Sequence, residues 1–193
     1  MRIISGKYKG RRITAPKNLP VRPTTDMSKE ALFNVLNNHF HFAELKVLDL
    51  FAGTGNISYE FGSRGCENIT SIDGDVGCIN FIKKTAKEFD LNITAIKNDV
   101  FKFLEKHKAT YDIIFADPPY GIEQKEFEKL IELVFENKLL DSAGMLVVEH
   151  SKRTKLNHMM HFSFEKNYGG SVFTFYEMEV DKNEDENQII SLK

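Results

Sequence analysis

The residues with the clearest chemical potential stand where an apolar run ends, at Asp117-Pro118-Pro119-Tyr120. Pro118 keeps Asp117 out of the helical conformation, and the two prolines remove successive backbone N–H donors. The carboxylate and the neighbouring carbonyl oxygens therefore form a fixed row of hydrogen-bond acceptors, which suits a substrate that offers an amino group. Tyr120 adds a flat ring on which a base can stack. A proline-terminated strand followed by a plain loop is the simpler interpretation of the same residues.

Glycines and acids also follow three earlier apolar runs. Gly53 and Gly55, in the segment DLFAGTGN, let the backbone turn tightly and approach a ligand, although a plain strand–helix turn explains them too. Asp73 ends the second run, where it can accept hydrogen bonds from both hydroxyls of a ribose. Asp99 follows the third run and can accept from an adenine amino group, with Val100 against the ring. Capping of the next helix explains Asp99 equally well.

These strand ends need a scaffold that brings them together. Continuous apolar runs that alternate with helical patterns are typical of a parallel sheet covered on both faces. We expect strands at 45–51, 68–73, 92–96, 111–116 and 145–150, and helices at 24–40, 56–64, 75–89, 99–107 and 123–138. The runs HFSFEKNY and SVFTFYEMEV then predict an antiparallel hairpin. The predicted fold is α/β, a doubly wound, mostly parallel Rossmann-like sheet, whose ligands bind at the carboxyl ends of the strands.

Charge is unevenly distributed along the 193-residue chain. The net charge is −2, yet residues 1–30 hold eight basic side chains against two acidic ones, which leaves −8 for residues 31–193. A cationic arm on an acidic body favours contact with a polyanion, although a solvated surface explains a charge run as well. We expect a short basic β-hairpin arm (1–25), a catalytic domain (26–180) and an acidic tail (181–193).

Composition excludes several classes of protein. Cys66 and Cys78 are the only cysteines, and their spacing argues against a disulfide framework or a zinc site. The N-terminus lacks the apolar segment of a signal peptide, and no apolar stretch approaches the length of a membrane span. We therefore expect a cytoplasmic monomer without a metal and without membrane contact.

Four segments of this sequence resemble a known family when they are read together. RIISGKYKGRRI, RPTTDMSKEALFNVL, DLFAGTG and DPPY follow one another within residues 1–180. They resemble class I S-adenosyl-L-methionine-dependent methyltransferases, and among these the bacterial family that methylates a guanine N2 in small-subunit (16S) ribosomal RNA. RPTTD combined with DPPY is far more specific than either alone. The resemblance implies S-adenosyl-L-methionine as cofactor, and ribosomal RNA or the assembling small subunit as partner.

The resemblance also implies roles for individual residues. The methionine part of the cofactor would lie against Asp49, Phe51, Ala52, Gly53, Thr54 and Gly55. Asp73 and Gly74 would hold the ribose, Asp99 and Val100 the adenine, and Asp117, Pro118, Pro119 and Tyr120 the target base. RNA would contact Arg2, Lys7, Lys9, Arg11, Arg12, Arg22, Thr24 and Thr25.

The chain departs from the family pattern at four positions, one of which is Ser28, where the family often has an apolar residue. Met27 stands where the family commonly has Arg, which removes one expected contact to cofactor or RNA. Asp73 and Asp99 stand where Glu and Asn are common, and both still provide a hydrogen-bond acceptor.

Other functions stay open at this point. The same acceptor motif serves N6-adenine methyltransferases of nucleic acids and protein glutamine methyltransferases. DNA enzymes usually carry a separate recognition domain, and glutamine enzymes usually show NPPY and a helical N-terminal domain. A nicotinamide-dependent oxidoreductase would use the same sheet, but its G-x-G-x-x-G fingerprint lacks the third glycine, because Ser58 occupies that position. A non-catalytic RNA-binding protein would not need the acids at the strand ends.

Overall fold

The computed structural model describes residues 1–16, 19, 25–119 and 121–178. Its strands are β1 (Lys46–Leu50), β2 (Asn68–Asp73), β3 (Ile93–Lys97), β4 (Tyr111–Ala116), β5 (Leu140–Ser151), β6 (Phe162–Tyr168) and β7 (Ser171–Glu177). Its helices are α1 (Asp26–Asn37), the short 3-10 helix η1 (Phe42–Glu44), α2 (Asn56–Ser63), α3 (Val76–Glu88), α4 (Val100–Lys106) and α5 (Gln124–Glu136). No described helix combines the length and the apolar character that a membrane span requires.

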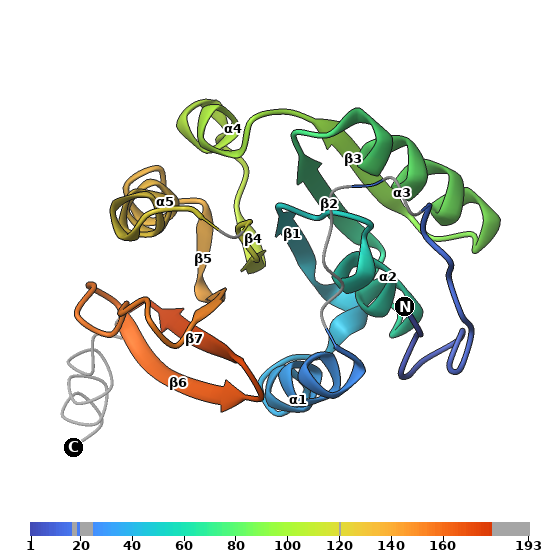
Figure 1. The fold of residues 1–193 in the computed structure, drawn as a ribbon, viewed down its shortest axis with the longest axis horizontal. Coiled ribbons are helices and arrows are strands. Elements are labelled where there is room, and N and C mark those ends of the chain that lie inside the picture. The colour runs from blue at the N-terminus through green and yellow to red at the C-terminus, as the bar shows by residue number, and fades with distance from the viewer. Residues whose placement is uncertain (17–18, 20–24, 120, 179–193) are drawn as a thin grey trace, which may run out of the picture.

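The strands form one sheet in the order β3-β2-β1-β4-β5-β7-β6 (Figure 1). β1 to β5 pair in parallel, and β7 pairs antiparallel with both β5 and β6. This arrangement confirms the predicted doubly wound sheet and its C-terminal hairpin. Because β1 lies between β2 and β4, the strand order reverses beside β1. The carboxyl ends of β1 and β4 meet there, and the Asp117 N–H donates to the Leu50 carbonyl oxygen (3.4 Å).

Helices cover both faces of the sheet, as the continuous apolar strands predict. On one face, Val47 and other strand residues pack with Leu32 and Phe33 of α1 and with Phe61 of α2. On the other face, Leu48 and its neighbours pack with side chains of α4 and α5. Figure 1 shows α1, α2 and α3 on one side of the sheet and α4 and α5 on the other. Both faces of the central strands are therefore core.

Most predicted elements differ from the structure by one or two residues at an end, and two differences have a clear physical cause. The helix expected at 24–40 begins at Asp26, because the Thr25 hydroxyl caps it by accepting from the Ser28 N–H (3.1 Å). β5 begins at Leu140 rather than at residue 145, since Leu140 pairs with Tyr111. The register shifts between Tyr111 and Ile113, so the polar residues 141–144 interrupt the apolar pattern without ending the strand.

The basic N-terminal arm is docked on α2. Its two segments run antiparallel through a bridge between Arg2 and Arg12. Ser63 binds the turn of the arm, because its carbonyl accepts from the Lys7 N–H (2.7 Å) and its hydroxyl donates to the Ser5 carbonyl (2.6 Å). Gly6 has φ +82, and a Cβ there would lie 1.8 Å from the Ser63 carbonyl oxygen. Only glycine fits this approach.

A fully buried carboxylate, Glu60 of α2, joins the arm to two helices. Its oxygens accept from the backbone N–H groups of Ile4 (2.8 Å) and Ser5 (3.0 Å). They also face the Arg64 Nε (2.9 Å) and the Nζ of Lys29 on α1 (3.3 Å), and Lys29 is 1% exposed. Burial lowers the pKa of Lys29, and the Glu60 carboxylate opposes that shift. The ion pair is therefore internal and depends on both partners.

We expect Glu60→Gln to lower the free energy of unfolding by about 3–5 kcal/mol, because it leaves the Lys29 ammonium buried without its counter-charge. Glu105→Gln is the matched control, since Glu105 pairs with Lys129 (3.2 Å) where both side chains are about half exposed. That substitution should change stability by less than about 1 kcal/mol. Urea unfolding monitored by circular dichroism gives both values. Equal changes in the two variants would contradict the structural role of the buried pair.

Candidate active site

The loop after β1 is built on left-handed backbone conformations. Phe51, Gly53 and Gly55 have φ values of +57, +52 and +80. A Cβ at Gly55 would lie 2.8 Å from the Tyr59 ring, so only glycine fits where the loop enters α2. The glycines that the sequence analysis singled out are therefore required by the turn itself. The Gly55 N–H donates to the Ala52 carbonyl (2.8 Å), which closes this loop at the carboxyl end of β1.

Asp73 at the end of β2 links the loop to the next strand. Its carboxylate accepts from the Gly53 N–H (2.8 Å) and from the Asp75 N–H (2.8 Å). A carboxylate offers about four acceptor positions, so these two hydrogen bonds leave room for the hydroxyls of a ligand. Asp73 is half-buried, and Gly74 beside it is exposed. The end of β2 can therefore hold a ribose, as the sequence predicts.

Asp49 lies beneath the loop, buried on every side. Its carboxylate accepts from the Ser58 hydroxyl of α2, and Ser58 is 2.8 Å from the Ser71 hydroxyl of β2. Burial raises the pKa of Asp49 to about 7, against the hydrogen bond from Ser58, which lowers it. The side chain is 1% exposed, so in this structure it supports the loop. A direct contact between Asp49 and a cofactor stays a prediction.

The residues expected at the adenine, Asp99 and Val100, lie at the start of α4, and their contact with an adenine stays a prediction. The Asp99 carboxylate accepts from the Lys102 N–H (3.0 Å) and caps α4, as the simpler interpretation predicted. The Val100 side chain is 3% exposed and packs in the core beside side chains of α5. Val76 is instead 55% exposed directly after the β2 loop, and Ile96 near the end of β3 is 36% exposed.

Those residues together fit S-adenosyl-L-methionine. The left-handed loop lets backbone approach the ligand, Asp73 offers carboxylate oxygens, and Val76 and Ile96 offer apolar surface. A nucleoside needs this pairing of an acceptor for the ribose with an apolar surface for the base. Thr54, also expected at the cofactor, lies in the same loop, and its side chain is buried at 4% exposure.

The acceptor row of Asp117, Pro118 and Pro119 stands immediately beside this loop. The Asp117 N–H donates to the Leu50 carbonyl oxygen (3.4 Å), and this hydrogen bond holds the acceptor row at the end of β1. Pro118 is buried and Pro119 is exposed, so the row passes from the core to the surface. The Ile122 N–H donates to the Pro119 carbonyl (3.4 Å) and closes a turn before α5. Tyr120 lies outside the described residues, and its stacking role stays a prediction.

The cations expected to contact RNA lie mainly on the docked arm. Lys9, Arg11 and Arg12 are exposed, and the Arg11 guanidinium lies 5.7 Å from the Phe89 ring. Arg2 pairs with Asp26 (3.0 Å), with both side chains partly exposed. Lys7 is exposed, and its Nζ lies 5.1 Å from the Tyr8 ring. Thr25 is occupied as the cap of α1, and Arg22 and Thr24 lie outside the described residues.

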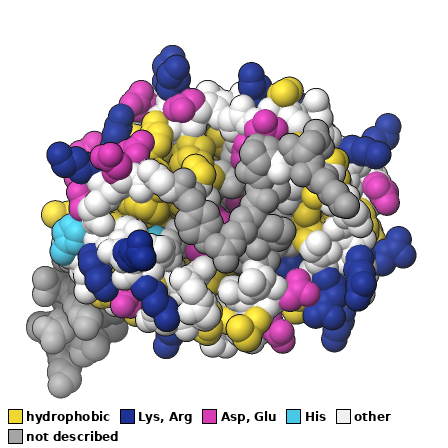
Figure 2. Space-filling view, in the orientation of Figure 1, with side chains coloured by type: hydrophobic (Ala, Val, Ile, Leu, Met, Phe, Trp, Pro, Cys, Tyr) yellow, Lys and Arg dark blue, Asp and Glu magenta, His cyan; other side chains and the backbone are white. Residues whose placement is uncertain are grey.

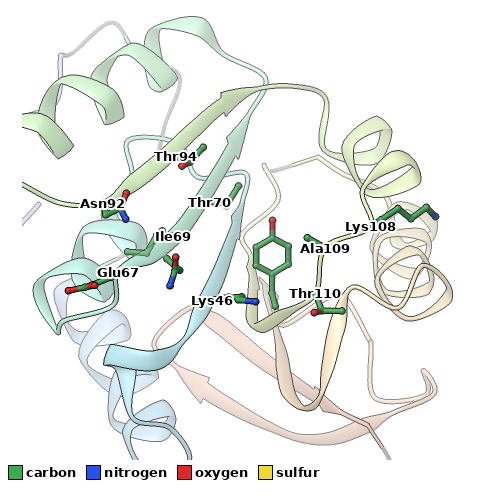
Figure 3. Close-up of a pocket in the computed structure, with 11 residues that line it drawn as sticks. Lys46, Glu67, Ile69, Thr70, Asn92, Thr94, Lys108, Ala109 and Thr110 are labelled. Atoms are coloured by element: carbon green, nitrogen blue, oxygen red, sulfur yellow. The ribbon is translucent and has the colours of Figure 1, made fainter.

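A separate cavity of about 500 Å³ opens at the opposite end of the sheet (Figure 3). Its lining includes Lys46, Asn68, Thr94 and Tyr111, which stand at or near the amino ends of their strands. In a sheet of this type, ligands bind at the carboxyl ends. This cavity is therefore not the candidate site.

The sequence of this chain matches a family model and several known proteins. A family model described as Conserved hypothetical protein 95 matches residues 1–177. The YlbH protein of Bacillus subtilis (strain 168) is 35% identical over 161 residues, which cover 81% of this chain and 85% of that protein. A protein of Buchnera aphidicola subsp. Baizongia pistaciae (strain Bp), named Ribosomal RNA small subunit methyltransferase D, is 33% identical over 150 residues, which cover 77% of this chain and 75% of that protein.

Solved structures share the fold. That of yhhF from Escherichia coli superimposes with a TM-score of 0.82 at 26% identity, covering 94% of this chain and 99% of that one. The 16S rRNA N2 G1207 methyltransferase (RsmC) of T. thermophilus, solved in complex with AdoMet and guanosine, has a TM-score of 0.68 at 18% identity. The match covers 83% of this chain and 45% of that one, and the likeness to it concerns the fold alone.

We expect Asp49 to make stability depend on pH. Its folded pKa of about 7 exceeds the ordinary value of 3.8, so between these values the folded chain binds more protons than the unfolded chain. The free energy of unfolding therefore falls as pH rises, by about 1.4 kcal/mol for each pH unit and about 4 kcal/mol over the interval. Asp49→Asn should remove this slope in urea unfolding at pH 4.5 to 7.5. The same slope in variant and parent would refute the assignment.

Proposed function

The chain belongs to the family described as Conserved hypothetical protein 95, and from that membership and the site we propose that it transfers a methyl group from S-adenosyl-L-methionine to the exocyclic N2 of a guanine in 16S ribosomal RNA. A protein that is 33% identical to this chain carries the name Ribosomal RNA small subunit methyltransferase D. The choice of guanine N2 follows the likeness of RPTTD and DPPY to the family that modifies this atom.

One observation carries the proposal. The acceptor row of Asp117 and Pro118 is hydrogen-bonded to the end of β1, where the glycine loop begins. An amino group held by the row would therefore lie beside whatever occupies the loop. Alignment of two reactants in this way supplies a large part of the rate of a transfer reaction.

The residues of the row can activate a poor nucleophile. The lone pair of a guanine N2 is delocalised into the ring, so the nitrogen reacts slowly by itself. When its N–H groups donate to the Asp117 carboxylate and the Pro118 carbonyl, the lone pair is localised on nitrogen and the developing positive charge is stabilised. When bound, S-adenosyl-L-methionine supplies an electrophilic methyl group on sulfur. Asp117 or water then accepts the proton that the methylated nitrogen loses.

The arm would supply contacts to the RNA backbone. Lys9, Arg11 and Arg12 are exposed on a segment that Glu60 and Ser63 hold against α2. Arginine and lysine contacts to phosphates fix the position of an RNA without reading its sequence. The target guanine must leave its stack to reach the acceptor row, as in other enzymes that modify bases.

The decisive test identifies the modified nucleoside. Small subunits or 16S RNA from cells that lack the protein are incubated with the chain and with methyl-labelled S-adenosyl-L-methionine, then digested to nucleosides. We expect the label in N2-methylguanosine. Label in N6-methyladenosine, or in protein, would refute the proposed target, and no label in any fraction would refute methyl transfer.

We expect Asp117→Ala to lower turnover at least about a hundredfold, because it removes a hydrogen bond to the charge that develops on nitrogen. Binding of S-adenosyl-L-methionine, measured by calorimetry, should stay within a few-fold of the parent. Asp112→Ala is the matched control at the other end of β4, where the Asp112 carboxylate accepts from the exposed Lys46 N–H (2.7 Å). Unchanged turnover in Asp117→Ala would exclude its proposed role.

A further inference from the structure

The segment that follows β5 carries a compact group of cations. Residues 151–156 read SKRTKL and include Lys152, Arg153 and Lys155 without an acidic residue. All three cations are exposed. They belong to the part of the chain, residues 31–193, whose sum of charges is −8. We call residues 151–156 the post-β5 turn.

Hydrogen bonds fix the backbone of the post-β5 turn. The Thr154 N–H donates to the Ser151 carbonyl (3.1 Å), and the Ser151 end continues the pairing of β5 with β7. The Gln124 amide accepts from the Lys155 N–H (3.2 Å) and donates to the Lys155 carbonyl (2.6 Å). Leu156 is fully buried and its carbonyl accepts from the Tyr176 hydroxyl (2.9 Å). The cations therefore extend from a rigid base, which reduces the entropy lost on binding.

The cations are available for an external partner. None of Lys152, Arg153 and Lys155 forms an ion pair with a carboxylate among the described residues. Two acids near the start of α5 are engaged elsewhere. Glu126 accepts from the Glu123 N–H (2.9 Å), and Glu128 accepts from Gln124 (2.8 Å) and faces His158 (3.2 Å).

The post-β5 turn borders the acceptor row on the side away from the arm. Ala116 of β4 pairs with Val148, so β5 runs past the end of β4 and brings the turn to the carboxyl end of the sheet. Gln124, which binds the turn, starts α5 a few residues after Pro119. The arm packs on α2 and α3, beyond β1 in the strand order. In Figure 2, Lys and Arg side chains lie over the arm on one side of the view and over the segment after β5 on the other.

We propose that Lys152, Arg153 and Lys155 form a second RNA contact surface, which binds phosphates on the flank of the site opposite to the arm. This inference rests on the proposed function. An enzyme that takes a base out of its stack is helped by binding the RNA backbone on both sides of that nucleotide. Contacts to phosphates provide such binding without reading the sequence.

The test compares three variants with the parent chain. Lys152→Gln, Arg153→Gln and Lys155→Gln together remove the three charges. Lys152→Arg, Arg153→Lys and Lys155→Arg keep them. Lys106→Gln, Lys108→Gln and Lys138→Gln remove three exposed charges near the amino ends of the strands, far from the acceptor row.

Each variant is assayed for binding of 16S RNA from 50 to 300 mM salt and for methyl transfer to it. For the first variant we expect the slope of log K against log salt to fall in magnitude by about 2 to 3, at about 0.7 to 0.9 for each lost phosphate contact. The KM for RNA should rise about tenfold, with kcat nearly unchanged. The other two variants should match the parent in slope, KM and kcat.

A salt slope and KM equal to those of the parent in the first variant would overturn the second surface. An equal change in the Lys106, Lys108 and Lys138 variant would also overturn it, because it would show a general effect of net charge. A parent chain that methylates no guanine would instead refute the proposed function. The salt slopes do not depend on turnover, so the two failures are distinguishable.

Discussion

The geometry of the candidate active site depends on the carboxylate of Glu60, which lies outside the site itself. With no exposed surface, Glu60 must be compensated internally, and two backbone amides of the arm and the cations of Lys29 and Arg64 compensate it. Lys29 also donates to Asn56, the first residue of α2, and to the Arg2 carbonyl. The arm, α1 and the start of α2 are thus joined at one point. Because α2 begins where the glycine loop ends, the position of that loop is tied to the same ion pair.

The parallel sheet supplies the other half of the geometry. Neighbouring parallel strands end at one edge, and hydrogen bonds cross between those ends: Gly53 to Asp73, Ala52 to Ile72, and Asp117 to Leu50. Each of these joins a loop to the strand beside it. Loops that would otherwise move independently therefore hold one another in place at the point where the strand order reverses. Such preorganisation is what transfer chemistry requires of a scaffold.

Local sequence patterns predicted the features that depend on neighbours in the chain. Short segments of the sequence show the glycines that the positive φ angles require, the prolines that end β4, and the alternation of strands and helices. The Lys29–Glu60 pair was not, since its partners are 31 positions apart and look like ordinary surface residues. Val76 and Val100 are each the first residue of a helix, yet Val76 is 55% exposed and Val100 is 3% exposed. Helical periodicity is least informative at the first residue of a helix, where one side of the chain is still loop.

The arm is attached to the catalytic core through its main chain as well as through buried side chains such as Ile3 and Ile13. Glu60 accepts from the amide groups of Ile4 and Ser5, which every residue except proline possesses. These two hydrogen bonds do not depend on which side chains stand at positions 4 and 5. Gly6, in contrast, cannot be replaced, because a Cβ there would collide with the Ser63 carbonyl. Related chains can thus vary the surface that the arm presents at these two positions while its attachment stays constant. In an evolutionary sense, the anchorage of the arm and the surface that it presents are separable traits.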